Sequence, residues 1–253
     1  MGGDVVAWPL QLQWVMTRLA LAALALTLAA CVGAPEDTIT PPHNDTGWAP
    51  FAQGEISEGE LGRSRFQIAV CAYPQMVGEL PSCSLDIPFI VGHRTAIFVD
   101  TEGRDATGLT LVSTQGAIVV DSACPENRYL RARITAAEPG TASLVVRGTD
   151  GAEIDRILVD VRPAASVTIE REDDDDVLAP GDETTMRAVA RSADGEMLNA
   201  YSELRWRLLD ETGALKLHGV RGWRVGVEAL AAGDERLRSE VGELGADVAL
   251  TVK

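Results

Sequence analysis

The chain has 253 residues and a formal net charge of −16 at pH 7, with 38 Asp and Glu residues against 22 Lys and Arg residues. This length suffices for one large domain or two modest domains. Because so negative a field repels phosphate groups, the composition argues against binding of nucleic acid and against electrostatic docking on anionic lipids.

The amino terminus has the layout of a secretory signal peptide. Arg18 precedes an apolar run rich in Leu and Ala, which ends in small residues before Cys31. The run is shorter than the ~20 residues that a membrane-spanning helix requires, so a cleaved signal is the better interpretation. Residues 1–30 are expected to be this signal, and the true start is either Met1 or Met16.

The residues at the expected cleavage point carry more specific information. Leu28-Ala29-Ala30-Cys31 resembles the lipobox of bacterial lipoproteins. The resemblance implies cleavage before Cys31 and acylation of that residue, so that acyl chains would hold the protein in a lipid bilayer of the cell envelope. Val32 stands where an Asp would indicate retention in the inner membrane, which favours the outer membrane. The side of the membrane on which the protein is displayed stays open.

The segment after the cysteine is expected to be a flexible tether. Residues 31–50 contain Pro35, Pro41, Pro42 and Pro50 and show almost no apolar periodicity. Such a segment is extended where it resembles polyproline, at ~3 Å per residue. The tether would hold the folded part away from the membrane.

The remainder of the chain reads as short strands separated by turns. Runs of β-prone residues bounded by Gly and Asp cover residues 66–70, 96–99, 109–112, 117–120, 144–146 and 157–161. Thr149-Asp150-Gly151 lies between the last two runs and predicts a hairpin. Since no window before residue 200 keeps a long helical period, the pattern predicts an all-β sandwich or barrel.

An internal repeat indicates how these strands are grouped. Residues 91–99 align with residues 180–188, residues 136–142 with residues 229–235, and residues 159–161 with residues 250–252. The three alignments share an offset of about 90 residues, and two copies of one module of that size explain it.

In the first copy, residues 134–146 contain a small-residue turn followed by β-prone residues, and the copy ends at Val161. The second copy begins with residues 165–169 and 178–184. These residues resemble bacterial Ig-like domains, group 2, the first set in the C-terminal half of that family, where such a turn leads into the last two strands, and the second set at its start. The family commonly places an aromatic residue on a central strand, which implies that Trp206 belongs to a core rather than to an exposed ligand site.

The resemblance implies two tandem Ig-like β-sandwich modules. The first would span residues 51–162, including an extra N-terminal segment, and the second would span residues 163–253. Residues 207–226 of the second module show no clear strand pattern, so its later strands are not placed by the sequence.

Three cysteines remain if Cys31 carries lipid. Cys71 and Cys83 enclose a short loop and are the favoured disulfide pair, with Cys71–Cys124 and Cys83–Cys124 as alternatives. In the favoured pairing Cys124 is left as a free, inert thiol.

The other candidates for chemistry are weak. His43, His93 and His218 lack the spacing of metal ligands. An acidic run could bind calcium through its carboxylates, although it lacks the alternating spacing of a calcium loop, and a solvated turn is the favoured interpretation. This run consists of Asp173, Asp174, Asp175 and Asp176. The sequence contains no nucleophile elbow, phosphate loop or dinucleotide fingerprint.

The sequence therefore predicts a lipid-anchored cell-envelope protein without catalytic activity or cofactor, with a structural or adhesive role toward an envelope protein or a surface polysaccharide. One alternative is a calcium-stabilised spacer or scaffold subunit of an envelope complex. Another is a small hydrolase, which requires a pocket that holds two or more carboxyl groups with raised pKa values.

Overall fold

The computed structural model describes residues 56–68, 84–102, 104–126, 128–172 and 177–253. These residues all belong to one compact unit, residues 45–253. Their regular structure consists of strands β1 to β17 without any helix. The described ranges accordingly hold no helix with the length and apolar character needed to cross a membrane.

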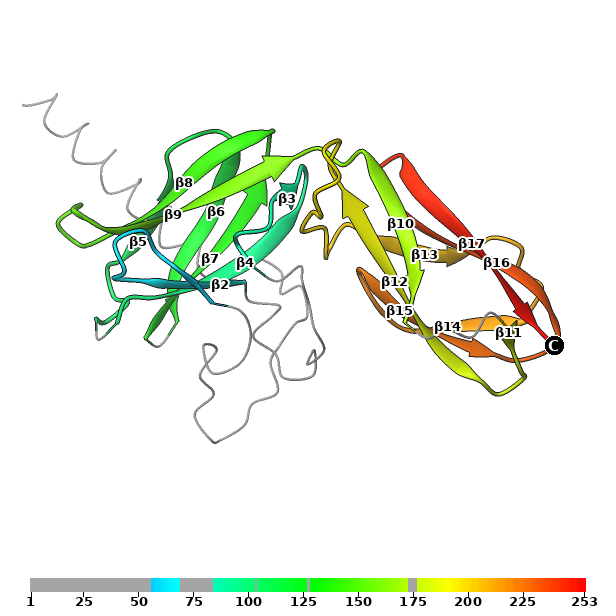
Figure 1. The fold of residues 1–253 in the computed structure, drawn as a ribbon. Helices are drawn as coiled ribbons and strands as arrows, with labels where there is room; N and C mark the ends of the chain where they lie inside the picture. The colour runs from blue at the N-terminus through cyan, green and yellow to red at the C-terminus, as the bar shows by residue number, and fades with distance from the viewer. Residues whose placement is uncertain (1–55, 69–83, 103, 127, 173–176) are drawn as a thin grey trace, which may run out of the picture. The chain divides into compact units, whose positions relative to one another are not determined.

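The strands up to residue 162 form two sheets that enclose one core (Figure 1). The five-stranded sheet has the order β1 (Ser57–Glu58), β2 (Arg65–Ile68), β4 (Arg94–Asp100), β7 (Tyr129–Ala136) and β6 (Ile118–Glu126). The four-stranded sheet has the order β3 (Phe89–Ile90), β9 (Glu153–Arg162), β8 (Gly140–Arg147) and β5 (Thr110–Ser113). Strand β3 runs parallel to β9, and the other pairs are antiparallel.

The strands from residue 166 onward repeat this arrangement. One sheet has the order β10 (Ser166–Arg171), β12 (Glu183–Arg191), β15 (Arg224–Ala229) and β14 (Leu215–Arg221). The other has the order β11 (Val177–Leu178), β17 (Leu244–Val252), β16 (Gly233–Val241) and β13 (Arg205–Leu208), with β11 parallel to β17. Two such facing sheets, with the first strand divided between them, form an immunoglobulin-like sandwich. The predicted fold class is confirmed.

Alternation of apolar and polar residues decides which face of strand β7 meets the core. In β7, Leu130, Ala132 and Ile134 are buried in the first core, whereas Arg131 and Arg133 point to the other face of the sheet. A period of two places every second side chain on the same face of a strand, so this pattern fixes which face of the sheet meets the core. The second core is built in the same way around Met186, Val225, Val227, Leu237 and Leu250.

The turns confirm that the aligned residues of the repeat occupy equivalent positions. Before β4, the Gly92 N–H donates to the Ala136 carbonyl at 2.7 Å, and before β12 the Gly181 N–H donates to the Ala229 carbonyl at 2.7 Å. Gly92 and Gly181 have φ angles of 91° and 96°, which a residue with a Cβ rarely adopts. The repeat therefore reflects a shared turn as well as shared strands.

Residues 207–226, where the sequence shows no clear pattern, do form strands. They contain the end of β13, all of β14 and the start of β15. Strand β14 has a shift in register between His218 and Arg221, where Gly219 has a φ of 57°. A bulge of this kind interrupts the alternation of side chains, which explains why periodicity alone does not reveal the strand.

The extra N-terminal segment is held by one buried carboxylate. Asp155 of β9 is fully buried and accepts hydrogen bonds from the backbone N–H groups of Leu61 at 2.8 Å and Arg63 at 2.7 Å. A Cβ at Gly59 would lie 2.3 Å from an Asp155 carboxylate oxygen, so this position requires glycine. The segment contains β1 and β2, and β2 pairs with the edge of β4. The segment thus extends the sheet on that side.

Replacement of this carboxylate should detach the N-terminal segment. Asp155→Ala leaves the partly buried backbone N–H groups of Leu61 and Arg63 without their carboxylate acceptor, at a cost of about 1–3 kcal/mol for each one that stays shielded from water. We expect a lower free energy of unfolding in urea, with early loss of protection at the Leu61 and Arg63 amides. Asp121→Ala is the matched control, because the Asp121 carboxylate is exposed and accepts a hydrogen bond from the Thr135 hydroxyl at 2.7 Å. Equal destabilisation by both variants would contradict this role for Asp155.

Candidate interaction surfaces

Many residues that the sequence singles out lie outside the described residues. These are Cys31, Cys71, Cys83, His43 and the acidic run of Asp173, Asp174, Asp175 and Asp176. The lipid anchor and the calcium site therefore stay predictions.

The expectation of a free thiol at Cys124 is wrong. Cys124 lies in β6 and is disulfide-bonded. It is the single cysteine in the described ranges, so its partner lies outside them. If Cys31 carries lipid, the partner is Cys71 or Cys83, and the favoured Cys71–Cys83 pair cannot form beside such a bond. Short sequence separation favoured that pair, whereas the fold decides which cysteines meet.

The two described histidines lie in different sandwiches. His93 precedes β4 and His218 lies in β14. Across the described ranges, no three His, Cys, Asp or Glu side chains are grouped so that they could hold a metal ion. His93 is only 2% exposed, and its ring stacks on Phe89 with ring centroids 5.1 Å apart.

The two sandwiches are joined by backbone pairing as well as by the continuous chain. Residues 192–204, here called the junction loop, connect β12 to β13. The Asn199 N–H donates to the Pro88 carbonyl at 2.7 Å, and the Ile90 N–H donates to the Asn199 carbonyl at 3.1 Å. These bonds form a parallel bridge between Phe89 and Asn199. The junction loop thus occupies the edge of β3 that β9 leaves open.

Apolar side chains are exchanged across the same contact. Tyr201 of the junction loop packs against the core of the first sandwich. In return, Ile90 of β3 joins a cluster of the second sandwich that includes Leu198 and Leu204. Interdigitated apolar groups resist separation because each would expose surface to water.

Polar contacts surround this apolar centre. The Ser202 hydroxyl oxygen lies 3.0 Å from Nδ1 of His93. At the rim, Arg162 of β9 forms ion pairs with Glu196 at 2.7 Å and with Asp194 at 3.4 Å. The junction therefore combines a backbone bridge, shared apolar packing and ion pairs.

The turn between β14 and β15 of the second sandwich contacts the junction loop. The Trp206 indole N–H donates to the Gly222 carbonyl at 2.6 Å, in the turn between β14 and β15. Trp206 is half-buried and packs against the second core, in accordance with its predicted core position. A Cβ at Gly222 would lie 1.7 Å from the Tyr201 carbonyl oxygen, so the turn and the junction loop are in direct contact.

A hollow beside the junction loop has a mostly apolar lining. It encloses about 330 Å³ of empty space, open solvent included. Its lining includes Arg187, Val189, Met197, Tyr201, Leu204 and Trp223. Among the described residues that line this hollow none carries a carboxyl group, so they do not supply the pair of carboxyl groups that the hydrolase alternative requires.

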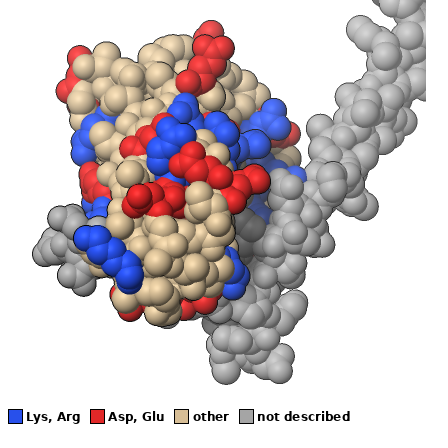
Figure 2. Space-filling view, turned by 90° about the vertical axis from the view of Figure 1, so that its right-hand side faces the viewer, with Lys and Arg blue, Asp and Glu red and all other residues tan. Residues whose placement is uncertain are grey.

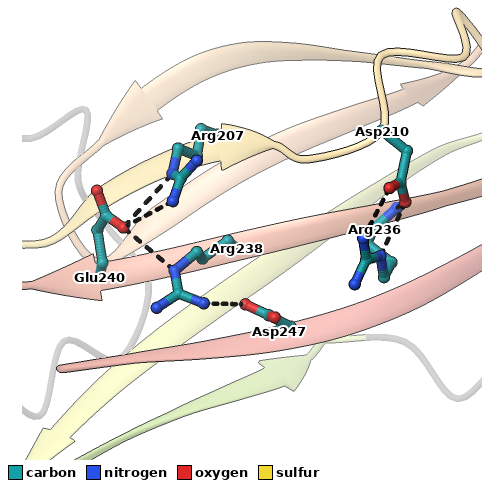
Figure 3. Close-up of polar contacts among 6 residues, drawn as sticks. All are labelled: Arg207, Asp210, Arg236, Arg238, Glu240 and Asp247. Carbon is teal, nitrogen blue, oxygen red and sulfur yellow. Dashed lines mark hydrogen bonds and ion pairs between the residues drawn. The ribbon is translucent and has the colours of Figure 1, made fainter.

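Paired charges cover the outer face of the sheet formed by β11, β17, β16 and β13 (Figure 3). The Glu240 carboxylate lies between two guanidinium groups and accepts from Arg238 at 3.2 Å and from Arg207 at 3.4 Å. Arg238 also donates to Asp247 at 2.9 Å. A Cβ at Gly245 would lie 2.7 Å from the Arg238 guanidinium, so the glycine lets this side chain lie flat on the sheet.

A second pair extends this charged face. Arg236 donates two side-chain hydrogen bonds to Asp210, at 2.9 and 2.8 Å, which ties the segment after β13 to β16. These bonds hold the pKa of the Asp210 carboxyl below its usual value. Figure 2 shows Lys and Arg side chains beside Asp and Glu side chains on the face that it presents. In a chain with a net charge of −16, the outer face of the sheet formed by β11, β17, β16 and β13 pairs its arginines with carboxylates.

No family model matches the chain, and no curated protein matches it either. Among solved structures, the chain is similar to the adhesin InvE of Yersinia pseudotuberculosis, with 15% identity, a TM-score of 0.34, and coverage of 66% of this chain and 56% of InvE. The Escherichia coli adhesin FdeC has 14% identity and a TM-score of 0.33, with 80% and 66% covered. Domains 4 and 5 of the S-layer protein SbsC have 19% identity and a TM-score of 0.28, with 58% and 77% covered. Scores this low say nothing about the activity of this chain.

Two glycines allow a direct test of the turn against the junction loop. Gly222 and Gly219 both have a positive φ, of 52° and 57°, but open space surrounds the Cβ position only at Gly219. Alanine should therefore cost the same left-handed strain at both positions and produce a clash only at position 222. We expect Gly222→Ala to lower the melting temperature clearly more than Gly219→Ala. Indistinguishable melting temperatures would contradict the close contact with Tyr201.

Proposed function

We propose that this protein is a lipid-anchored cell-envelope protein that presents two coupled Ig-like sandwiches in a structural or adhesive role without catalysis. The observation that carries the proposal is the junction, in which Asn199 pairs with the edge of β3 and the two sandwiches exchange apolar side chains. Domains on free linkers move independently, whereas direct pairing makes a stiff element of two modules. Stiffness is what a spacer or a displayed binding surface requires.

The charged face of the second sandwich supports a binding role. Arg207, Arg238 and Arg236 each hold a carboxylate in a fixed geometry, so the face presents ordered donors and acceptors. Arginine is enriched in protein interfaces because its planar group both donates hydrogen bonds and stacks. The partner we propose for this face is another envelope protein or a surface polysaccharide, and the outer membrane is the proposed location.

The lipid anchor can be tested at a single atom. Cys31→Ser removes the thiol that would be acylated, and we expect the protein to lose incorporation of labelled fatty acid. Val32→Ala changes the neighbouring residue but keeps the thiol, so this control should still incorporate the label. Unchanged labelling of Cys31→Ser would refute the anchor.

Protease treatment of intact cells tests display to the exterior. If the sandwiches adhere to a surface outside the cell, externally added protease should remove the described region from intact cells, as detected with antibodies against the second sandwich. The same treatment of permeabilised cells is the control for susceptibility. Full protection in intact cells and cleavage after permeabilisation would exclude an extracellular adhesive role and leave a scaffold that faces the periplasm.

A further inference from the structure

His93 and its counterpart in the repeat, Asp182, differ in the role of the side chain: that of Asp182 stabilises its own turn, whereas that of His93 does not. His93 and Asp182 follow the equivalent glycines, and the N–H groups of both close the same turn, onto Ile90 at 3.1 Å and onto Ala179 at 2.9 Å. The Asp182 carboxylate also accepts from the Ala179 N–H at 2.7 Å, which is the usual way for Asp to stabilise a turn. The His93 ring instead faces Ser202 in the other sandwich.

The surroundings of the His93 ring favour its neutral form. The ring is 2% exposed, stacks on Phe89, and has the Ser202 hydroxyl as its hydrogen-bond partner. The Ser202 hydroxyl in turn lies within hydrogen-bonding distance of the Arg94 carbonyl, at 3.1 Å, and of the Glu203 carboxylate, at 2.9 Å. Burial lowers the pKa of His93 to about 4, from an ordinary value of 6.5.

The charged groups nearest to the junction do not neutralise a protonated ring. On β4, the adjacent Arg94 is itself a cation. On the junction loop, Glu203 reaches the ring only through Ser202, and Asp194 and Glu196 are paired with Arg162 of β9. Among the described residues, no carboxylate forms a direct hydrogen bond or ion pair with His93. A charge placed on this ring would therefore be buried without a directly bonded counter-ion, with the Glu203 carboxylate one hydroxyl group away, and burial of such a charge is costly.

We propose that His93 is an acid-sensitive latch between the two sandwiches: protonation of its ring releases the junction loop from the edge of β3 while each sandwich stays folded. Opening exposes the ring to water and allows it to bind a proton. Since the open form binds the proton more tightly than the closed form, the closed junction is stable above the ordinary pKa of histidine and weakens as the pH falls toward the lowered value.

The geometry confines the effect to the junction. Release breaks the two bonds of Asn199 with Pro88 and Ile90, but β3 keeps its parallel pairing with β9 on the other side. The apolar cluster of the second sandwich around Val225 and Leu237 contains no described residue of the junction loop, whereas Leu198 and Leu204 belong to the separate cluster that Ile90 joins. Undocking of the loop therefore separates Ile90 from its apolar cluster and removes Tyr201 from the core of the first sandwich. The strands of both sandwiches stay paired.

Amide hydrogen exchange on the full-length chain, followed by NMR, tests the latch. With pKa values of 6.5 open and about 4 closed, the protection factors of the Ile90 and Asn199 amides should fall about 30-fold between pH 7.5 and pH 5, after correction for intrinsic exchange. The equivalent turn amides of the second sandwich, Gly181 and Ala229, should keep theirs. Unchanged protection at Ile90 and Asn199 would overturn the proposal, as would an equal loss at amides throughout β4 and β7, which would indicate unfolding of the sandwich.

Histidine variants assign the effect to one ring. His93→Gln keeps a neutral polar group opposite Ser202, so protection at Ile90 and Asn199 should no longer depend on pH over this range. His218→Gln is the matched control and should behave as the parent chain does. Persistence of the pH dependence in His93→Gln would refute the role of this ring. If that variant does not fold, the NMR titration of His93 in the parent chain decides, because an ordinary pKa near 6.5 would equally rule out the latch.

Discussion

Strand β3 has only two residues, Phe89 and Ile90, yet its backbone is paired on both sides. On one side it runs parallel to β9, which places it in the sheet of the first sandwich. On the other side, Asn199 of the junction loop forms a parallel backbone bridge with Phe89. An unpaired strand edge exposes donors and acceptors that attract other chains, so covering this edge both protects the first sandwich and joins the second one to it. The coupling of the modules depends on this bridge.

The second sandwich carries two separate surfaces, the junction and the charged face. The junction loop holds the module to its neighbour through apolar packing and backbone pairing. The outer face of β17, β16 and β13 carries Arg207, Arg238 and Glu240 in a fixed network, away from the apolar side of the same sheet. One sandwich can carry both the junction and the charged face because side chains on a strand point alternately to opposite faces of the sheet. The residues that build the core are thereby separated from those that meet solvent.

Sequence and structure agree most closely where the interactions are local. The β-prone run that predicted a strand at residues 96–99 belongs to β4, and the shared glycine turns at Gly92 and Gly181 underlie the repeat. Agreement fails at β14, because the bulge after His218 removes the periodic signal. It fails also at Cys124, because pairing of cysteines depends on distances in space and not along the chain.

By itself, the sequence determined the all-β fold, the two-module repeat and the turn glycines, since each depends on the conformation of neighbouring residues and on a period of two. Only the tertiary structure decided that Asn199 completes the edge of β3 and that His93 meets Ser202, 109 residues further along the chain. Asn199, His93 and Ser202 carry no periodic pattern that would mark them. Their partners are chosen when two folded sandwiches bring distant segments together, and no local preference of the chain encodes that meeting.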